Sequence, residues 1–428
     1  MTYPEAIEFL YGLQLFGTNL GLENTRSLAT LCGNPQDALR FIHVAGTNGK
    51  GSVCAMLESV YRHHGLRVGL FTSPHLISFT ERIQVNRIPI PENEVVRITE
   101  MLSAQLGDNP DQWPFKPTFF EFVTVMALVY FKEAGCELVV WETGLGGRLD
   151  ATNIVQPLAS VITNIQFDHQ QWLGSALAQI ATEKAGIIKA AVPIITAVEP
   201  GEAFEVIERT AESLRAPLIR VKPPWIDGRL TQVSLLGEHQ KINATVALAT
   251  IDTLQAKLPV REEAITRGLA NTVWPGRLQI IRHENTTVLL DGAHNPDGAR
   301  TLARAIETSF SGREVTLVLG LFKDKDWPSI CDVLVPRAAR VFLVPLPSER
   351  SAEPIELLQH CTSHWPNVET RSFPSVEAGI NESLRFPFVV IAGSLYLVGE
   401  AMQILGLVPD KGSERGLNEW DAGGAKAK

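Results

Sequence analysis

Residues 39–65 carry the pattern that most narrows the choice of folds. Segment 39–46, LRFIHVAG, is a continuous apolar run, and residues 46–52, GTNGKGS, form a glycine-rich turn. Residues 52–65 then show the apolar spacing of a helix that ends at a glycine. A further apolar run follows at 67–75. The order strand, loop, helix, strand predicts a parallel sheet in an α/β domain.

The same pattern recurs along the chain. A helical apolar stretch at 119–132 precedes a strand-like run at 137–142, and a glycine-rich loop and a second run at 159–165 come next. A helix is predicted at 175–185 and another strand at 192–198. Because polar residues follow several of these runs, we expect them to converge at the carboxyl edge of one sheet.

A second series of strand-like runs begins after the breaker Pro275–Gly276. It includes apolar segments at 286–291, 314–320, 339–345 and 386–393, with helical stretches between them. The predicted fold class is therefore α/β with two domains. The expected parts are a P-loop-type parallel-sheet domain at 1–276, a Rossmann-like α/β domain at 277–410 and a flexible polar tail at 411–428.

Composition excludes several functional classes. The 428 residues contain 38 basic and 47 acidic side chains, so a net charge of −9 offers no attraction to nucleic acid or to an anionic membrane. The longest strongly apolar run, 122–131, is shorter than a membrane span, and Glu5 and Glu8 replace the positive charge of a signal peptide. Five scattered cysteines without a C-x-x-C pair are expected to be reduced. These features favour a cytoplasmic protein.

The loop at 46–52 predicts nucleotide binding. The usual phosphate-loop template would need glycine at Val44 and a hydroxyl directly after Lys50, so this loop is a shortened variant. Its glycines nevertheless let the backbone approach a phosphate, Lys50 supplies a positive charge, and Ser52 can bind magnesium. A purely structural glycine turn is the alternative interpretation.

Polar residues at the ends of three apolar runs suggest a metal site. Glu142 ends a hydrophobic strand, Asp168 and His169 follow another, and Ser73 follows the run at 67–75. Oxygen and imidazole ligands suit a metal ion that balances phosphate charge. The alternatives are a salt-bridged acid, a loop histidine and a Ser-Pro turn.

Two further loops are rich in candidate functional residues. The segment 144–153, GLGGRLDATN, suggests a close approach of backbone to a ligand, but it does not open a helix as a dinucleotide fingerprint would. The segment 290–298, LDGAHNPDG, groups Asp291, His294 and Asn295 between a strand and a helix. A capped helix start explains that second group equally well.

The long motifs together resemble a known family. In order along residues 10–405, the chain contains GTNGKGS, TSPHL, ERIQV, PTFFEF, ETGLGGRLDATN, ITNIQFDHQQWLG, EKAGIIK, NA at 243–244, PGRLQ, LDGAHNPDGA and GSLYLVG. This order resembles the Mur-ligase superfamily and, within it, the folylpolyglutamate synthase and bifunctional dihydrofolate synthase family. The resemblance implies an N-terminal ATPase domain, which is the family's central ATP-binding domain, and a C-terminal glutamate-ligase domain.

The resemblance also implies roles for individual residues. The residues that match the family's ATP loop are Thr47, Asn48, Gly49, Lys50, Gly51 and Ser52. Asn243, Arg277 and Asp291 match residues that hold the nucleotide from the far side of a domain cleft. Ser73, Glu142 and His169 match the magnesium ligands of a site expected to hold two ions, and Lys184 in EKAGI matches a lysine that is carbamylated in this family. The implied catalytic residues are Lys50, Lys184 and His294.

A pterin site is implied as well. Its matching residues are Asn19, Leu20, Gly21, Leu22, Thr118, Phe120, Leu149, Asp150 and Ala151. The ring of Phe120 could stack on a flat heterocycle, although its helical spacing alone favours a core position.

The reaction implied by the resemblance is ATP-dependent amide formation. A carboxylate of dihydropteroate or a folate would become an acyl phosphate, which the amine of L-glutamate attacks. The implied partners are these small molecules, with no nucleic acid and no membrane, and a monomer is expected. One alternative is a UDP-muramyl amino-acid ligase of the same superfamily, although only 45 residues precede Gly46, too few for its UDP-binding domain. Another is a non-catalytic ATP-binding switch.

Overall fold

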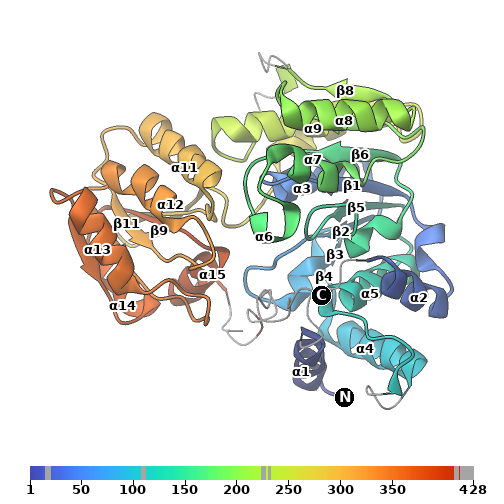
Figure 1. Ribbon diagram of the computed structural model, residues 1–428, viewed down its shortest axis with the longest axis horizontal. Helices are drawn as coiled ribbons and strands as arrows, with labels where there is room; N and C mark the ends of the chain where they lie inside the picture. The colour runs from blue at the N-terminus through green and yellow to red at the C-terminus, as the bar shows by residue number, and fades with distance from the viewer. Residues whose placement is uncertain (15–20, 108–111, 223–227, 230–232, 409–413, 415–428) are drawn as a thin grey trace. The chain divides into compact units, whose positions relative to one another are not determined.

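The computed structural model describes residues 1–14, 21–107, 112–222, 228–229, 233–408 and 414 (Figure 1). Asn19, Leu20 and nearly all of the tail at 411–428 lie outside these residues. The described chain forms two compact units. Of the described residues, unit 1 contains those up to 234 and 240–273, and unit 2 contains 235–239 and those from 274 to 414. Each unit is an α/β structure with a mainly parallel sheet, which confirms the predicted fold class.

Unit 1 is built on an eight-stranded sheet with the order β4-β3-β2-β5-β1-β6-β7-β8. The strands from β2 to β8 pair in parallel, whereas β3 and β4 are antiparallel additions at one edge. The strands are β1 (Phe41–Ala45), β2 (Val68–Phe71), β3 (Ile83–Val85), β4 (Ile88–Pro89), β5 (Leu138–Glu142), β6 (Ala159–Ile162), β7 (Ile194–Thr196) and β8 (Leu218–Arg220).

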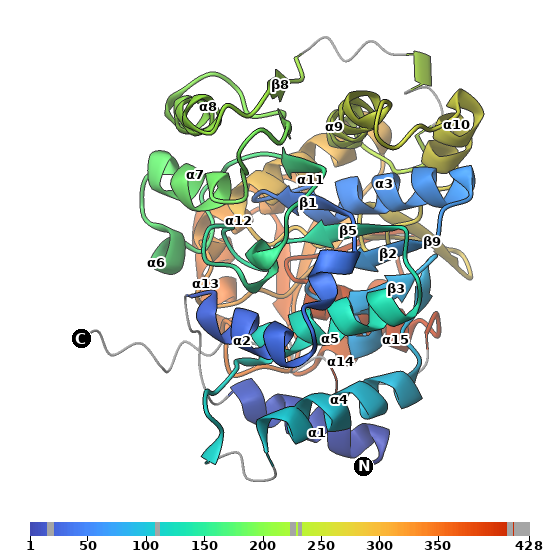
Figure 2. The ribbon, with the colours of Figure 1, turned by 90° about the vertical axis from the view of Figure 1, so that its right-hand side faces the viewer.

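Helices cover both faces of this sheet, and Figure 2 shows α3 on one side and α5 on the other. The α-helices are α1 (Tyr3–Gln14), α2 (Glu23–Leu31), α3 (Lys50–His64), α4 (Glu92–Leu106), α5 (Phe119–Glu133), α6 (Gln170–Leu173), α7 (Leu177–Ala185), α8 (Glu202–Ser213), α9 (Glu238–Leu254) and α10 (Glu262–Ala270). Short 3₁₀ turns are η1 (Pro35–Ala38), η2 (Phe79–Arg82) and η4 (Ala151–Ile154).

The central strands are fully buried, which explains their uninterrupted apolar sequences. Every residue of β1 and β5 is buried, because helices cover both faces of a parallel sheet. Trp141 of β5 stacks on Phe71 with ring centroids 4.4 Å apart, and its edge meets Phe41 and Phe131. This aromatic cluster fixes the strands whose carboxyl ends carry the candidate site.

Unit 2 contains a six-stranded sheet with the order β13-β12-β11-β14-β10-β9, in which only β9 is antiparallel among the described strands. Its strands are β9 (Gln279–His283), β10 (Thr286–Leu290), β11 (Thr316–Leu319), β12 (Arg340–Leu343), β13 (Glu369–Ser372) and β14 (Phe388–Ala392). Its helices are α11 (Pro296–Ser309), α12 (Trp327–Leu334), the 3₁₀ turn η6 (Val335–Arg337), α13 (Pro354–His364), α14 (Val376–Ser383) and α15 (Leu395–Ile404).

The structure adds features that the sequence did not predict. The hairpin of β3 and β4 and the edge strands β8, β9 and β13 were not anticipated, because their sequences are short or polar.

No helix within the described ranges is both long enough and apolar enough to cross a membrane. All five cysteines carry free thiols.

Candidate active site

The glycine-rich loop joins the end of β1 to the start of α3, as predicted. Gly49 caps α3 with a φ of +84°, in the left-handed region that favours glycine. Gly46 has a φ of +150°, and a Cβ there would lie 1.9 Å from the hydroxyl oxygen of Thr163. Both glycines are therefore required by the local backbone and by its close packing.

Hydrogen bonds from the segment after β6 hold the loop in place. The amide of Thr47 donates to the Asn164 carbonyl at 3.0 Å, and the amide of Asn48 donates to Asn164 Oδ1 at 2.8 Å. The hydroxyl of Thr163 donates to the Asn48 carbonyl at 2.6 Å. Two loop amides thus bond to protein, so a phosphate would meet mainly the amides in the first turn of α3.

Two lysines converge on one carbonyl of this loop. The ammonium groups of Lys50 and Lys184 donate to the Gly46 carbonyl at 3.1 Å and 2.9 Å. Lys184, on α7, is only 3% exposed. Burial, and to a lesser extent the nearby Lys50, lower its pKa to about 7, and Asp168 and Asp150 partly oppose the shift. A substantial fraction of Lys184 is therefore a neutral, nucleophilic amine near pH 7.

The structure brings Ser73 and Glu142 together at the carboxyl edge of the sheet. Glu142 is the last residue of β5 and is 3% exposed, and Ser73 follows β2 by two residues. The amide of Ser73 donates to Glu142 Oε2 at 3.2 Å. Adjacent parallel strands thus place a hydroxyl beside a buried carboxylate.

His169 occupies a different local setting from the one expected. Asp168 and His169 do not directly follow a strand, because β6 ends at Ile162 and a loop intervenes. His169 caps α6 with a φ of +50°, and its amide donates to Asp168 Oδ1 at 2.8 Å. Its imidazole Nε2 lies 3.9 Å from the same oxygen. The carboxylate of Asp168 therefore orients His169.

The chemistry of these side chains fits a magnesium ion. Across the described chain, no three His, Cys, Asp or Glu side chains form a group that could hold a metal by themselves. The Ser73 hydroxyl and the Glu142 carboxylate are hard oxygen donors, which suit Mg²⁺ bound partly through substrate phosphates rather than in an all-protein cage.

Those residues predicted to bind a pterin that the structure describes lie on three segments of unit 1. The ring of Phe120, at the start of α5, lies over Gly144, where a Cβ would be 2.5 Å from the ring. It also faces Phe71, with ring centroids 5.9 Å apart, and is only partly buried. Thr118 caps α5 and is buried, and Leu22 caps α2 directly after Gly21. Phe120 thus lies between the core and the glycine-rich loop at 144–153.

Asp150 has a structural role in that loop. Its carboxylate accepts the amide of Leu145 at 2.7 Å and the amide of Thr152 at 3.0 Å. Burial raises its pKa, although these hydrogen bonds oppose the shift. Its neighbours Leu149 and Ala151 are half-buried and buried. Asp150 therefore shapes the loop through internal hydrogen bonds.

Asn243, which the resemblance grouped with Arg277 and Asp291, lies in unit 1, whereas those two residues lie in unit 2. Asn243 lies on the part of α9 that belongs to unit 1, and a Cβ on Gly49 would be 2.5 Å from its Oδ1. Its side-chain Nδ2 donates to Gln240 Oε1 at 2.9 Å, and Gln240 Nε2 donates to Ser52 Oγ at 3.2 Å. Gln240 was not among the predicted site residues, although the segment GEHQKINA at 237–244 could have indicated it.

Unit 2 contains its own group of candidate residues. Asp291 follows β10 and accepts the amides of Leu278 at 2.9 Å and Ala293 at 3.0 Å. Arg277 lies near, since a Cβ on Gly292 would be 2.7 Å from its guanidinium. His294 Nδ1 lies 2.8 Å from the Gly292 carbonyl. These bonds fold the turn after β10 tightly around the Asp291 carboxylate.

His239 is a second residue that the sequence analysis missed. It belongs to unit 2 and lies in the electrostatic field of Asp291, Arg277 and Asp297. Burial lowers its pKa, so the neutral imidazole is favoured beside these charged groups.

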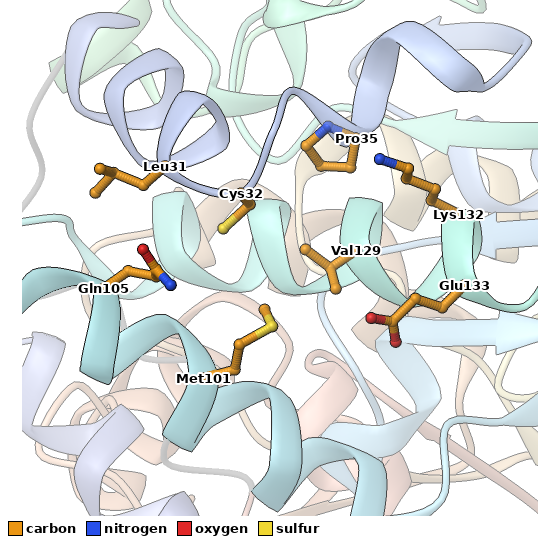
Figure 3. Close-up of a pocket in the computed structure, with 8 residues that line it drawn as sticks. All are labelled: Leu31, Cys32, Pro35, Met101, Gln105, Val129, Lys132 and Glu133. Carbon is orange, nitrogen blue, oxygen red and sulfur yellow. The ribbon is translucent and has the colours of Figure 1, made fainter.

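A pocket of about 140 Å³ lies elsewhere in unit 1 (Figure 3). It shares no residue with the candidate site, so we assign it no part in the chemistry. The residues that line it are Leu31, Cys32, Pro35, Met101, Gln105, Val129, Lys132 and Glu133.

Comparison with known proteins places these features in one family. Residues 44–212 match the Mur ligase middle domain, and residues 276–394 match the Mur ligase glutamate ligase domain. The chain is 34% identical to the dihydrofolate synthase/folylpolyglutamate synthase of Bacillus subtilis, over 93% of this chain and 98% of that protein.

Solved structures agree. Folylpolyglutamate synthase of Mycobacterium tuberculosis, complexed with ADP and AMPPCP, matches with a TM-score of 0.86 at 29% identity, over 95% of this chain and 100% of the other. An Escherichia coli protein in complex with DHPP and ADP matches with a TM-score of 0.82 at 31% identity, over 95% and 98%. The chain therefore belongs to the dihydrofolate synthase/folylpolyglutamate synthase family.

Proposed function

We propose that this chain is an ATP-dependent ligase that joins L-glutamate to dihydropteroate, to folates or to both. Membership of the family supports the reaction class and disfavours the UDP-muramyl alternative. The observation that carries the proposal is the phosphate loop at the start of α3, where Lys50 and the first helical amides offer positive charge. The relatives bound to ADP support ATP as the substrate.

The chemical step requires charge stabilisation. A substrate carboxylate oxygen attacks the γ-phosphorus of ATP, ADP leaves, and an acyl phosphate forms. The amine of glutamate then attacks the acyl carbon, inorganic phosphate leaves, and the amine loses a proton as the amide forms. Lys50 stabilises negative charge on the phosphoryl group in the first step. Ser73, Glu142 and His169 would hold Mg²⁺, expected as two ions, whose charge neutralises the phosphate oxygens.

Lys184 is proposed to be carbamylated. Its neutral amine would add to the carbon of dissolved carbon dioxide with loss of one proton, so that a cation becomes an anion. Replacing the Lys184 cation by an anion relieves the repulsion between the two ammonium groups that share the Gly46 carbonyl. The lowered pKa supports this proposal because only the neutral amine is a nucleophile.

Residues of unit 2 are proposed to bind the other reactants. Arg277 and Asp291 would contact the nucleotide, and His294 would orient or deprotonate the glutamate amine. His294→Ala that kept wild-type turnover at saturating glutamate would remove His294 from the mechanism. Phe120, with Thr118 and the loop at 144–153, would bind the pterin ring.

We also propose a cellular compartment, a class of partners and an oligomeric state. The free thiols of all five cysteines support a reducing compartment such as the cytoplasm. The acidic net charge of −9 supports small-molecule partners rather than nucleic acid. We propose a monomer, which light scattering can test against the chain mass of 47.0 kDa.

The deciding experiment is an assay of the purified protein with ATP, Mg²⁺ and L-glutamate. Dihydropteroate, a reduced folate and a UDP-muramyl acceptor are supplied separately, and phosphate release and product mass are followed. We expect one glutamyl unit to be added per phosphate released with a pterin acceptor. Product from the muramyl acceptor alone would favour the other ligase class. Nucleotide binding without acceptor-dependent phosphate release would indicate a switch.

A further inference from the structure

The helix α3 is connected to every point at which the described chain leaves or enters unit 1. These points follow Ser234, His239 and Val273. On the unit 1 side, the points after His239 and Val273 are held by residues that interact directly with α3, and the point after Ser234 is held by α10, which packs against α3. We call the chain segments at these three points the linkers. Because α3 begins at the phosphate loop, each linker is connected through α3 to that loop.

The linker after Val273 is held through a buried acid. Arg87, in the turn between β3 and β4, donates from Nη2 to the Val273 carbonyl at 2.7 Å. Its Nε lies 3.9 Å from Oε2 of Glu58, a fully buried residue of α3. The other carboxylate oxygen of Glu58 accepts from Arg62 Nε at 2.7 Å. Arg87 and the buried Glu58 thus interact as an ion pair without a hydrogen bond, and separating them would leave the carboxylate with Arg62 alone.

The linker after Ser234 is held at the end of α10. The hydroxyl of Ser234 donates to the Thr272 carbonyl at 2.5 Å. The hydroxyls of Thr272 and of Ser59, on α3, both donate to the Gly268 carbonyl at 2.8 Å. A Cβ on Gly268 would lie 2.5 Å from the Cα of Val60. The two helices are therefore in backbone contact, and Figure 2 shows them side by side.

The third point lies in the first turn of α9. Gln240, which is 1% exposed, donates to Ser52 Oγ in the first turn of α3. Its Oε1 accepts from Asn243, whose own Oδ1 faces Gly49. One hydrogen bond, from Gln240 to Ser52, therefore joins the first turn of α3 to the residue that directly follows this point.

We propose that Arg87 and Gln240 are positioning residues that fasten the linkers to α3, so that nucleotide at the start of α3 restrains the linkers together with the phosphate loop. The proposal rests on the proposed nucleotide binding by this loop. It predicts that loosening a linker slows the reaction, which needs residues of both units, more than it weakens nucleotide binding, most of whose proposed contacts lie in the phosphate loop of unit 1.

The test compares two arginines that bind the same carboxylate. Arg87→Met removes the contact with the Val273 carbonyl, whereas Arg62→Met removes only a partner of Glu58 and serves as the control. For Arg87→Met we expect kcat for glutamate-dependent phosphate release to fall about tenfold, with the Kd for ADP changed less than about twofold. For Arg62→Met we expect both quantities within about twofold of wild type.

Hydrogen exchange provides a readout that a merely structural role would not move. In wild type, Mg²⁺-ADP is expected to slow amide exchange in peptides covering residues 270–278, and Arg87→Met is expected to abolish that protection. If Arg87→Met does not fold, Arg87→Lys, which retains the charge but lacks the forked donor, is measured with the same expectation.

The outcomes separate the two proposals. Wild-type kcat and wild-type linker protection in the Arg87 variant would overturn the positioning role, as would an ADP-bound wild type without linker protection. A wild type that neither binds ADP nor releases phosphate with glutamate and a pterin acceptor would refute the proposed function instead.

Discussion

At the scale of single residues, the candidate site depends on close contacts that leave no room for substitution. Gly46 meets Thr163, Gly49 meets Asn243, and Lys184 shares a carbonyl with Lys50. Each contact joins segments that are far apart in the chain. Substitutions at these positions should therefore weaken ligand binding more than substitutions of similar residues away from the site.

Gly49→Ala is expected to lower ADP affinity at least about tenfold, because it combines left-handed strain with a clash against Asn243. The control is Gly65→Ala at the other end of α3, where φ is +107° and nothing lies within 4 Å of a new Cβ. That variant should lose about 1 kcal/mol of stability and keep its ADP affinity. Calorimetric titration with ADP measures the affinity of each variant, and chemical denaturation measures its stability. Equal ADP affinities in the two variants would contradict the prediction.

Lys184 should make the unfolding free energy depend on pH. Its pKa in the folded chain is about 7, below the ordinary value of 10.5. Between these pH values the unfolded chain binds more protons, so the unfolding free energy rises with pH across that window. Lys184→Met removes this dependence and leaves the Gly46 carbonyl bonded to Lys50.

In urea titrations without bicarbonate, the unfolding free energy of Lys184→Met should exceed that of wild type by at least about 1 kcal/mol at pH 7. The difference should shrink toward pH 10. The exposed Lys132→Met on α5 serves as the control. A difference between Lys184→Met and wild type that does not vary with pH would argue against a cost of burying this ammonium.

At the scale of elements, the helix caps show where structural and functional effects separate. Thr118 caps α5 by accepting the Glu121 amide at 3.3 Å, and Ser375 caps α14 by accepting the Ala378 amide at 3.1 Å. Only Thr118 lies beside Phe120 at the proposed pterin site. The two caps therefore form a matched pair.

Thr118→Ala and Ser375→Ala should each cost about 1 kcal/mol of stability, because each leaves a helix amide without its cap. Only Thr118→Ala should also raise KM for the pterin acceptor. Chemical denaturation and steady-state kinetics measure the two effects. An unchanged KM in Thr118→Ala, or an equal rise in Ser375→Ala, would remove Thr118 from the proposed pterin site.

The elements also show how far the sequence could predict the fold. Strands β1, β5 and β14 are continuous apolar runs because both faces are buried, so they were predicted. Strand β13, with the sequence ETRS, carries no such signal because it lies at an exposed edge. Its position depends on pairing with β12 rather than on its own residues.

The residues of the candidate site also divide into those that the sequence predicted and those that it could not. The order of strands and loops predicted that Ser73 and Glu142 would meet, because adjacent parallel strands end at one edge. It could not place Gln240 on Ser52, because the two residues are 188 positions apart and most strands and helices of unit 1 lie between them, so their contact depends on tertiary packing. Only the resemblance suggested Asn243, and it grouped the residue with Arg277 and Asp291, which lie in unit 2.

At the scale of the whole molecule, each unit has its own hydrophobic core. In unit 1 the aromatic cluster of Phe41, Phe71 and Trp141 is central, and in unit 2 Phe388 stacks on Phe310 with centroids 5.1 Å apart. Separate cores allow separate cooperative unfolding.

Differential scanning calorimetry is therefore expected to resolve two transitions. At an ADP concentration one hundred times Kd, the transition of unit 1 should gain about 3 kcal/mol, because the loop that binds the phosphate folds with that unit. Unit 2, expressed alone, would identify the other transition. A single transition that shifts as a whole would show instead that the units unfold together.

The short strand β4 closes one edge of the larger sheet with Pro89, and it is only two residues long. Proline has no amide hydrogen, so this edge lacks a donor that an incoming strand from another molecule would need. The exposed Ile88 beside it consequently cannot seed an extended ribbon of chains, and concentrated solutions should resist strand-by-strand aggregation at this border.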